Sequence, residues 1–163
     1  MRVGLGFDIH RLTPGRALVL GGVKIPFSRG LLGHSDADVL THSVMDAVLG
    51  ACALGDIGRH FPDTDPAYKD ISSIRLLNRT RQIAAAAGFA VSSLDAVIMA
   101  EEPKLNPYFE AMRAEIAGAL GIAAERVSLK ATTAEGLGFV GRGEGMAAQA
   151  VALVEEINGT AGL

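Results

Sequence analysis

Short runs of alternating apolar and polar residues, separated by glycine and proline, make up the N-terminal part of the chain. This pattern predicts two short strands joined by a TPGR turn at residues 13–16, with the glycine pair at 21–22 marking a bend or a hairpin. Within the first strand, Asp8 and His10 stand two positions apart. Since alternate side chains of a strand share a face, both should project to one side while their apolar neighbours project to the other.

Residues 38–54 are predicted to form a helix, which Asp38 can cap at its start and Gly55 follows at its end. At about 100° per residue, the apolar side chains fall on two faces, so the helix should be buried on nearly all sides. His42 lies on one of these faces and must find a partner there.

The remaining two thirds of the chain contain a proline-rich segment followed by alternating helix and strand patterns. We predict, in chain order, a loop, a helix, a strand, a second helix and a second strand over residues 59–70, 71–87, 90–102, 106–121 and 126–135. Asp70 should cap the first of these helices, and the Asn106–Pro107 pair is a strong start signal for the next. The last stretch, residues 145–157, is ambiguous because its alanines favour a helix while its spaced valines and leucines suit a buried strand.

Length and composition indicate one apolar domain. A chain of 163 residues suits a single catalytic domain over residues 1–163, with roughly 70% of the unfolded surface buried on folding. The hydrophobic content of 49% and mean hydropathy of +0.30 are high for this size, which favours burial of apolar surface against other subunits.

The net charge and the N-terminal sequence limit the classes of partner that we expect for this chain. The net charge of −3 and the absence of a basic run argue against a nucleic-acid partner. The N-terminal residues lack the apolar stretch of a signal peptide, and no run approaches the roughly 18 apolar residues of a membrane span. We therefore expect a cytoplasmic protein with no membrane partner. Cys52, the only cysteine, excludes an internal disulfide and a thiolate metal cage.

Asp8, His10 and His42 together match a catalytic zinc site, which uses three protein ligands and leaves a fourth position for substrate or water. An alternative is that His42 is a core histidine bonded to a backbone carbonyl and that Asp8 merely ends a strand. Asp46, one helical turn after His42 on the same face, could accept the free N–H of a metal ligand or be an ordinary buried hydrogen-bond partner.

Three further motifs carry polar chemistry. GHSDADV, residues 33–39, could present side chains and amides to an anion or simply cap the following helix. KATTAE, residues 130–135, suits phosphate oxygens and a hard divalent ion, or is an exposed strand with threonine at favourable positions. GFVGRGEG, residues 138–145, is a weak phosphate-loop signal, and the alternative for Arg142 is a solvated loop charge.

The order of these motifs is more specific than any one of them. GFDIH, HSDADV with LTH, ALGDIG with FPDTDP, AEEPKL, KATTAE with LGF, and GRGEG follow one another along essentially the whole chain. Together they resemble the 2-C-methyl-D-erythritol 2,4-cyclodiphosphate synthases of the non-mevalonate isoprenoid pathway. In that family the D-x-H pair and the later histidine hold one zinc ion, so the resemblance implies that Asp8, His10 and His42 hold Zn²⁺ here.

The resemblance also implies a substrate site with several parts. His34 and Ser35 would meet the erythritol phosphate, with His34 stabilising the reacting phosphates beside the zinc ligands Asp8 and His10. Contacts to ribose or erythritol hydroxyls would come from Asp56, Ile57 and Gly58. The loop that closes over the substrate would consist of Phe61, Pro62, Asp63, Thr64 and Asp65.

The nucleotide half of the site is implied in the same way. The cytosine pocket would be formed by Ala100, Glu101, Glu102, Pro103, Lys104, Leu105 and Asn106. Thr132 and Thr133 would hold the diphosphate beside Ala134, with Thr133 acting in catalysis. Glu135 would bind a second ion, Mg²⁺ or Mn²⁺, and Phe139 and Arg142 would line the edge. Glu101, Glu102 and Ala134 depart from the usual family pattern, and the two glutamates could alter nucleotide affinity.

The implied fold is α+β: a single-domain two-layer sandwich of a mainly four-stranded mixed sheet with helices on one face, assembling as a homotrimer. Such a fold would make the ambiguous last stretch a strand. The implied reaction converts a cytidine diphosphate substrate, 4-diphosphocytidyl-2-C-methyl-D-erythritol 2-phosphate, into the 2,4-cyclodiphosphate and CMP. Two other functions fit the same residues: a metal-dependent nucleotide diphosphate hydrolase, and a non-catalytic metal or isoprenoid-phosphate binding protein.

Overall fold

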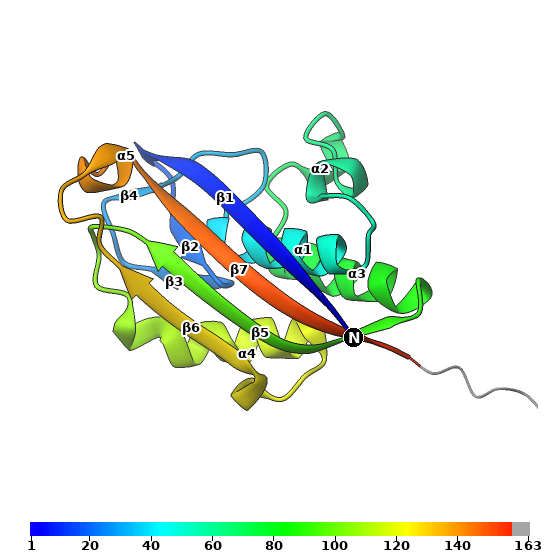
Figure 1. The fold of residues 1–163 in the computed structure, drawn as a ribbon. Helices are drawn as coiled ribbons and strands as arrows, with labels where there is room; N and C mark the ends of the chain where they lie inside the picture. The colour runs from blue at the N-terminus through cyan, green and yellow to red at the C-terminus, as the bar shows by residue number, and fades with distance from the viewer. Residues whose placement is uncertain (158–163) are drawn as a thin grey trace, which may run out of the picture.

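A mixed five-stranded sheet forms one layer of the computed structural model, which describes residues 1–157 (Figure 1). Its strand order is β4-β1-β7-β5-β6, with β5 and β6 parallel and the other pairs antiparallel. The strands span Arg2–Pro14 (β1), Arg29–Leu31 (β4), Phe89–Met99 (β5), Val127–Thr132 (β6) and Gly145–Glu156 (β7). A separate hairpin consists of β2 (Leu18–Leu20) and β3 (Val23–Ile25). The α+β class is confirmed, but the sheet has five strands rather than four, because the short β4 pairs with the end of β1.

The second layer consists of helices on one face of the sheet (Figure 1). The three long helices are α1 (Val39–Ala51), α3 (Ser73–Ala86) and α4 (Phe109–Leu120). Two short helices are α2 (Ile57–His60) and α5 (Gly138–Gly141), and three 3₁₀ turns are η1 (Pro66–Tyr68), η2 (Asn106–Tyr108) and η3 (Ala124–Arg126). The loop predicted over residues 59–70 therefore contains the end of α2 and η1. None of the helices in the part of the chain described is long and apolar enough to cross a membrane.

The ambiguous C-terminal stretch is a strand, β7, and it pairs with β1 on one side and β5 on the other. Ala148, Ala150 and Ala152 alternate along it, and each is at most 1% exposed. Small side chains at these positions allow α1 to pack close to the sheet. The alanines are therefore present for their small size on the helix-facing side of a strand. Their number nevertheless gives this stretch a composition that is typical of a helix.

Strand β1 approaches α1 so closely that two of its residues must be glycine. A Cβ atom on Gly6 would lie 1.9 Å from the Ser43 carbonyl oxygen, and one on Gly4 would lie 2.1 Å from that of Ala47. This contact places the helix-facing side chains of β1 directly against α1. His42, one residue before Ser43, is thereby brought to the same place as the alternate residues of β1.

The N-terminus of α1 is fixed by a buried carboxylate. The Asp38 side chain accepts hydrogen bonds from the backbone and hydroxyl of Thr41, and also from the backbone N–H groups of Gly21 and Gly22 in the β2–β3 turn. The predicted cap and turn are both confirmed, and one side chain joins them. Burial raises the pKa of the Asp38 carboxyl.

The predicted capping of the next helix by Asp70 is wrong. Helix α3 begins at Ser73 and its N-cap residue is Ser72, two residues later than the cap position predicted. Asp70 instead adopts a left-handed backbone conformation, with φ of 55°, and its N–H donates to the His34 carbonyl. The N–H of Ser73 donates to the side chain of Asp36, an acceptor from a distant loop that a local sequence pattern does not reveal.

The sheet face opposite the helices is apolar and open. Alternate residues of β1, namely Val3, Leu5, Phe7 and Ile9, are between 45% and 67% exposed. Val151 of the neighbouring strand β7 is also exposed and is the register partner of Leu5. A contiguous apolar surface of this kind is typical of an interaction site.

Candidate metal and substrate site

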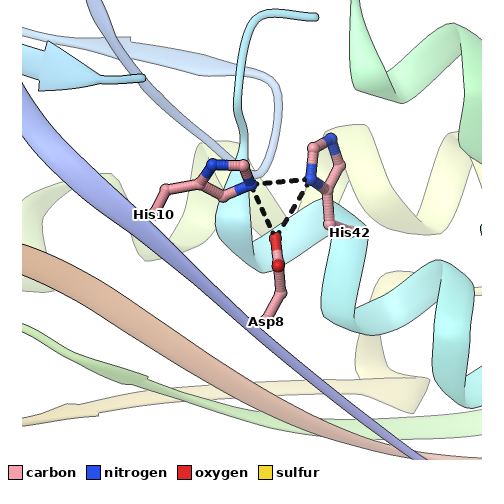
Figure 2. Close-up of side chains that lie close together, drawn as sticks. All are labelled: Asp8, His10 and His42. Carbon is pink, nitrogen blue, oxygen red and sulfur yellow. Dashed lines mark hydrogen bonds and ion pairs between the residues drawn. The ribbon is translucent and has the colours of Figure 1, made fainter. Parts of the chain in front are cut away.

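Three side chains meet between β1 and α1 (Figure 2). Asp8 and His10 project from β1, as their alternation predicts, and His42 projects from the first half of α1. Asp8 Oδ2 lies 2.8 Å from His10 Nε2 and 3.0 Å from His42 Nδ1. The two ring nitrogens are 3.1 Å apart. The sequence prediction that these three residues form one cluster is confirmed.

The outer nitrogen of each ring has its own partner. His10 Nδ1 lies 2.7 Å from the Leu32 carbonyl oxygen, which can only accept, so this nitrogen donates. A neutral His10 therefore directs the lone pair of Nε2 toward Asp8. His42 Nε2 lies 2.9 Å from Ser73 Oγ and 3.2 Å from Ser35 Oγ.

Asp46 is an ordinary hydrogen-bond partner and not the acceptor for His42. Its Oδ1 accepts the backbone N–H of Ile57 at 2.8 Å, which ties α1 to the start of α2. Burial raises the pKa of the Asp46 carboxyl. The spacing of one helical turn from His42 is therefore compatible with a contact but does not create one, because Ser73 from α3 occupies that place.

The electrostatics of the cluster favour a negative carboxylate. Burial alone would raise the pKa of Asp8, but hydrogen bonds and charge interactions with His10 and His42 lower it to about 2. Burial alone would lower the pKa of His10, but the Asp8 carboxylate raises it above the ordinary value. In the metal-free chain, Asp8 therefore favours a proton on His10, and a cation that replaced this proton would retain the attraction.

The donor set fits zinc. Two imidazole nitrogens and one carboxylate oxygen are the ligands of many catalytic zinc sites. Ligands about 2.0 Å from a tetrahedral zinc lie about 3.3 Å from one another. The separations in this cluster, from 2.8 to 3.1 Å, are close to that value. Asp8, His10 and His42 could therefore hold one zinc ion and leave a position open on the cavity side.

A cavity of about 420 Å³ opens beside the cluster. It brings together most of the residues predicted to bind the erythritol phosphate: Asp8, His10, His34, Ser35, Ile57, Gly58, Phe61, Pro62 and Asp63. Three other predicted residues, Asp56, Thr64 and Asp65, are not among its lining residues. The Asp56 and Asp65 side chains accept backbone N–H groups at the starts of α2 and η1.

His34 is held by the segment that the sequence predicts to close over the substrate. Its Nε2 lies 3.2 Å from the Asp65 carbonyl oxygen, and its own carbonyl accepts the N–H of Asp70. These contacts join the loop before α1 to the segment around η1. Movement of residues 61–65 would therefore change the hydrogen bond and the position of the His34 side chain.

A second cavity, of about 410 Å³, lies at the ends of β5 and β6. It is lined by the predicted nucleotide residues Ala100, Glu101, Pro103, Lys104, Leu105, Asn106, Thr132 and Thr133. Glu101 also fixes its rim, since its Oε1 accepts the backbone N–H of Ala134 at 2.7 Å. Thr133 hydrogen-bonds to Glu135, whose φ of 52° is an unusual backbone conformation for a glutamate.

The predicted residues do not all meet in one place. Glu102 and Arg142 line a third cavity, in which Arg29 is a further cation. Phe139, on α5, lies against the start of β7, where a Cβ added to Gly145 would be 3.4 Å from its ring. Within residues 1–157, no residue lines both the cavity beside the cluster and the cavity at the ends of β5 and β6. The predicted substrate site is therefore divided between separate surfaces of one chain.

Sequence reasoning did not assign a role to Ser73 or to the side chain of Asp36. Ser73 is fully buried at the start of α3 and contacts His42, which is 31 positions earlier. Asp36 belongs to the polar GHSDADV segment, but its target lies 37 positions later. Each contact joins two elements through the tertiary fold, so no local spacing marks it.

Comparison with known proteins places the chain in a family. The YgbB family model matches residues 1–155. A 2-C-methyl-D-erythritol 2,4-cyclodiphosphate synthase from Pelotomaculum thermopropionicum is 62% identical over 156 residues, which is 96% of each chain. No support for a hydrolase or for a non-catalytic binding protein comes from these relatives.

Solved structures agree with this assignment. A 2C-methyl-D-erythritol-2,4-cyclodiphosphate synthase in a CDP-bound form has a TM-score of 0.86 and 36% identity, covering 94% of this chain and all of its own. The bifunctional IspDF from Campylobacter jejuni has a TM-score of 0.91 and 43% identity, covering 95% of this chain and 42% of its own. The chain belongs to the YgbB family of 2-C-methyl-D-erythritol 2,4-cyclodiphosphate synthases.

Proposed function

We propose that this chain converts 4-diphosphocytidyl-2-C-methyl-D-erythritol 2-phosphate into the 2,4-cyclodiphosphate and CMP. The 2-phosphate attacks the β-phosphorus, a new P–O bond closes the ring, and the bond to the CMP phosphate breaks. The observation that carries the proposal is the convergence of Asp8, His10 and His42 beside a cavity in a member of this family. The domain that performs the reaction includes the whole matched region, residues 1–155.

The chemistry requires charge neutralisation and orientation rather than a strong base. The attacking phosphate is already an anion, so repulsion between anions and the entropy of ring closure oppose the step. A zinc ion held by Asp8, His10 and His42 would supply positive charge to the transferring phosphate. His34, which lines the same cavity, would donate a hydrogen bond to a phosphate oxygen once its Nε2 leaves the Asp65 carbonyl. Holding both ends of the substrate can contribute up to roughly 7 to 11 kcal/mol toward the barrier.

Thr133 and Glu135 are suited to the diphosphate and to a second ion. The two side chains hydrogen-bond to each other at the end of β6, next to the cavity that Lys104 lines. Carboxylate oxygen is a preferred ligand of Mg²⁺ and Mn²⁺, which commonly bind together with substrate phosphates. We assign Glu135 to this second ion and Thr133 to the diphosphate. Lys104 would face the cytidine half of the substrate.

A CDP-bound relative supports a cytidine nucleotide as a ligand, and we assign it to the cavity at the ends of β5 and β6. The lining combines apolar Ala100 and Leu105 with polar Lys104 and Asn106, which suits a base with several hydrogen-bonding groups. Glu101 anchors the opposite rim through the N–H of Ala134. The extra acidity of Glu101 is therefore partly directed into the protein and away from the nucleotide.

We further propose a homotrimer in which each substrate site is shared. The open apolar face of the sheet, formed by Val3, Leu5, Phe7, Ile9 and Val151, would be buried between subunits. Since the two substrate cavities of one chain share no lining residue within the part described, a neighbouring chain could bring its nucleotide cavity to the zinc cavity. The separation of the cavities is the observation that favours a shared site.

The test of the proposed function is a CMP-release assay with the diphosphocytidyl substrate, zinc and Mg²⁺, in which ³¹P NMR identifies the second product. We expect equal amounts of CMP and cyclic diphosphate. His42→Ala is the matched control, because it removes a cluster ligand from the same folded chain. The proposal fails if the unchanged chain releases no CMP, or if CMP appears without cyclic product.

A further inference from the structure

The inner end of the His42 ring lies against two buried serines. Ser73 Oγ is 2.9 Å from His42 Nε2, and Ser35 Oγ is 3.2 Å from it. Ser73 is fully buried and Ser35 is nearly so. Because a hydroxyl can donate or accept, the distances alone do not say which tautomer of His42 is present.

The partner of Ser73 removes this ambiguity. Asp36 Oδ1 accepts a hydrogen bond from Ser73 Oγ, and Asp36 Oδ2 accepts the backbone N–H of Ser73 at 2.9 Å. An ionised carboxylate has no proton to give, so the hydroxyl proton of Ser73 must point to Asp36. The Ser73 oxygen then presents only lone pairs to His42.

It follows that His42 Nε2 carries the proton and donates it to Ser73. Zinc would take the place of the proton between Nδ1 and Asp8, and Nδ1 would then offer its lone pair to the metal beside Asp8 and His10. This is the form in which imidazole binds a metal. Ser35 makes no such selection, since its oxygen accepts the N–H of Ala37 and its proton is committed to no other partner among residues 1–157.

We propose that Asp36 and Ser73 are positioning residues that fix the tautomer and the ring orientation of His42 for metal binding. The inference rests on the zinc site proposed above. Asp36 lies in the loop before α1, Ser73 begins α3 and His42 lies within α1, so three elements are joined at one ring. Partners of this kind commonly change metal affinity by about 10 to 100-fold.

A purely structural role is the competing explanation, because Asp36 also anchors the start of α3 through the N–H of Ser73. That role predicts a lower free energy of unfolding for the variants, with normal zinc affinity in the molecules that remain folded. The proposed role predicts weaker zinc binding by the folded protein. The two explanations are separated when stability and zinc affinity are measured independently.

The experiment measures zinc dissociation constants by competition with a chromophoric chelator, using the metal-free full chain and its variants Ser73→Ala, Asp36→Asn and the double variant. We expect each single variant to bind zinc at least about 10-fold more weakly. Asp36→Asn should act without touching His42, because its amide can donate to Ser73 and release the Ser73 proton toward Nε2. The matched control is Ser43→Ala, which removes a fully buried hydroxyl from the residue after His42, one that donates only to the Leu40 carbonyl.

The double variant tests whether Asp36 acts through Ser73. If it does, adding Asp36→Asn to Ser73→Ala should change the zinc affinity by less than about twofold. The inference is overturned if the single variants bind zinc within about twofold of the unchanged chain. It is also overturned if the losses of zinc affinity in the two single variants multiply in the double variant. If the unchanged chain itself binds no zinc, the proposed metal site fails and the inference fails with it. If Ser73→Ala does not fold, the test is the zinc affinity of Asp36→Asn, which keeps the side-chain volume, compared with the zinc affinity of Ser43→Ala.

Discussion

The close approach of β1 to α1 makes Gly6→Ala the most informative single substitution. The added Cβ would lie 1.9 Å from the Ser43 carbonyl oxygen and 2.6 Å from the Ala47 nitrogen, both of which are backbone atoms. Cβ atoms in real proteins essentially never lie within 3.0 Å of such atoms. The strand and the helix must therefore move apart by about 1 Å, since no side chain can rotate away.

Two consequences should follow from this displacement. Overpacking costs about 1 to 3 kcal/mol, and we expect about 3 kcal/mol here because the clash involves the helix backbone. Zinc affinity should also fall, because Asp8 and His10 move with β1 while His42 moves with α1. A shift of about 1 Å at a reacting site can cost on the order of 100-fold in rate.

The assay is equilibrium unfolding in guanidinium chloride together with chelator competition for zinc. Gly50→Ala is the matched control, because Gly50 is also in α1 and an added Cβ there would meet only the Leu5 carbonyl oxygen, at 3.8 Å. Replacing a helical glycine at such a site should stabilise the chain by about 0.5 to 1 kcal/mol. If Gly6→Ala loses less than about 1 kcal/mol and binds zinc normally, the tight β1–α1 contact does not position the site.

His42→Ala should weaken zinc binding by about 100-fold or more and abolish activity, since two ligands cannot hold a catalytic zinc; full zinc content by metal analysis would contradict this. Glu135→Gln should leave zinc in place but raise the Mg²⁺ concentration needed for activity by roughly 10-fold, because an amide is a poorer ligand for a hard cation; an unchanged Mg²⁺ titration would exclude Glu135. In the zinc-free chain, Asp8 raises the pKa of His10, so the stability from this pair is fully present below about pH 6.5 and is lost as the pH rises through the raised pKa. Urea unfolding at a series of pH values should therefore show stability decreasing through this range, and a flat or rising profile would oppose the ion pair. Finally, His42→Ala and Thr133→Ala chains, unfolded and reassembled together, should recover CMP release if sites are shared between subunits; activity no higher than the average of the two parents would reject sharing.

Much of the site was predictable because several of its residues lie a few positions apart within one strand or helix. The two-residue separation of Asp8 and His10 places both on one face of β1, and this holds in the fold. The capping of α1 by Asp38 was predictable for the same reason, as residues three positions apart meet at a helix start. Such features depend only on the geometry of a single strand or helix.

Features that depend on tertiary contacts were predicted less well. Asp70 has the side chain of a helix cap, but the chain turns there with a left-handed backbone and α3 starts later. Asp46 has the right helical spacing to contact His42, yet Ser73 of α3 takes that place. The short β4 was missed because its three residues form a strand only through pairing with β1. In each case a partner distant in sequence decides the outcome.

The central claim is that this chain closes a ring within its substrate and does not transfer phosphate to water. The most direct measurement is the reaction in ¹⁸O-labelled water, followed by mass spectrometry of CMP and of the second product. Intramolecular attack by the 2-phosphate predicts that neither product carries the label and that the second product is the cyclic diphosphate. Incorporation of ¹⁸O into either product, with a linear phosphate in place of the cyclic diphosphate, would contradict the account.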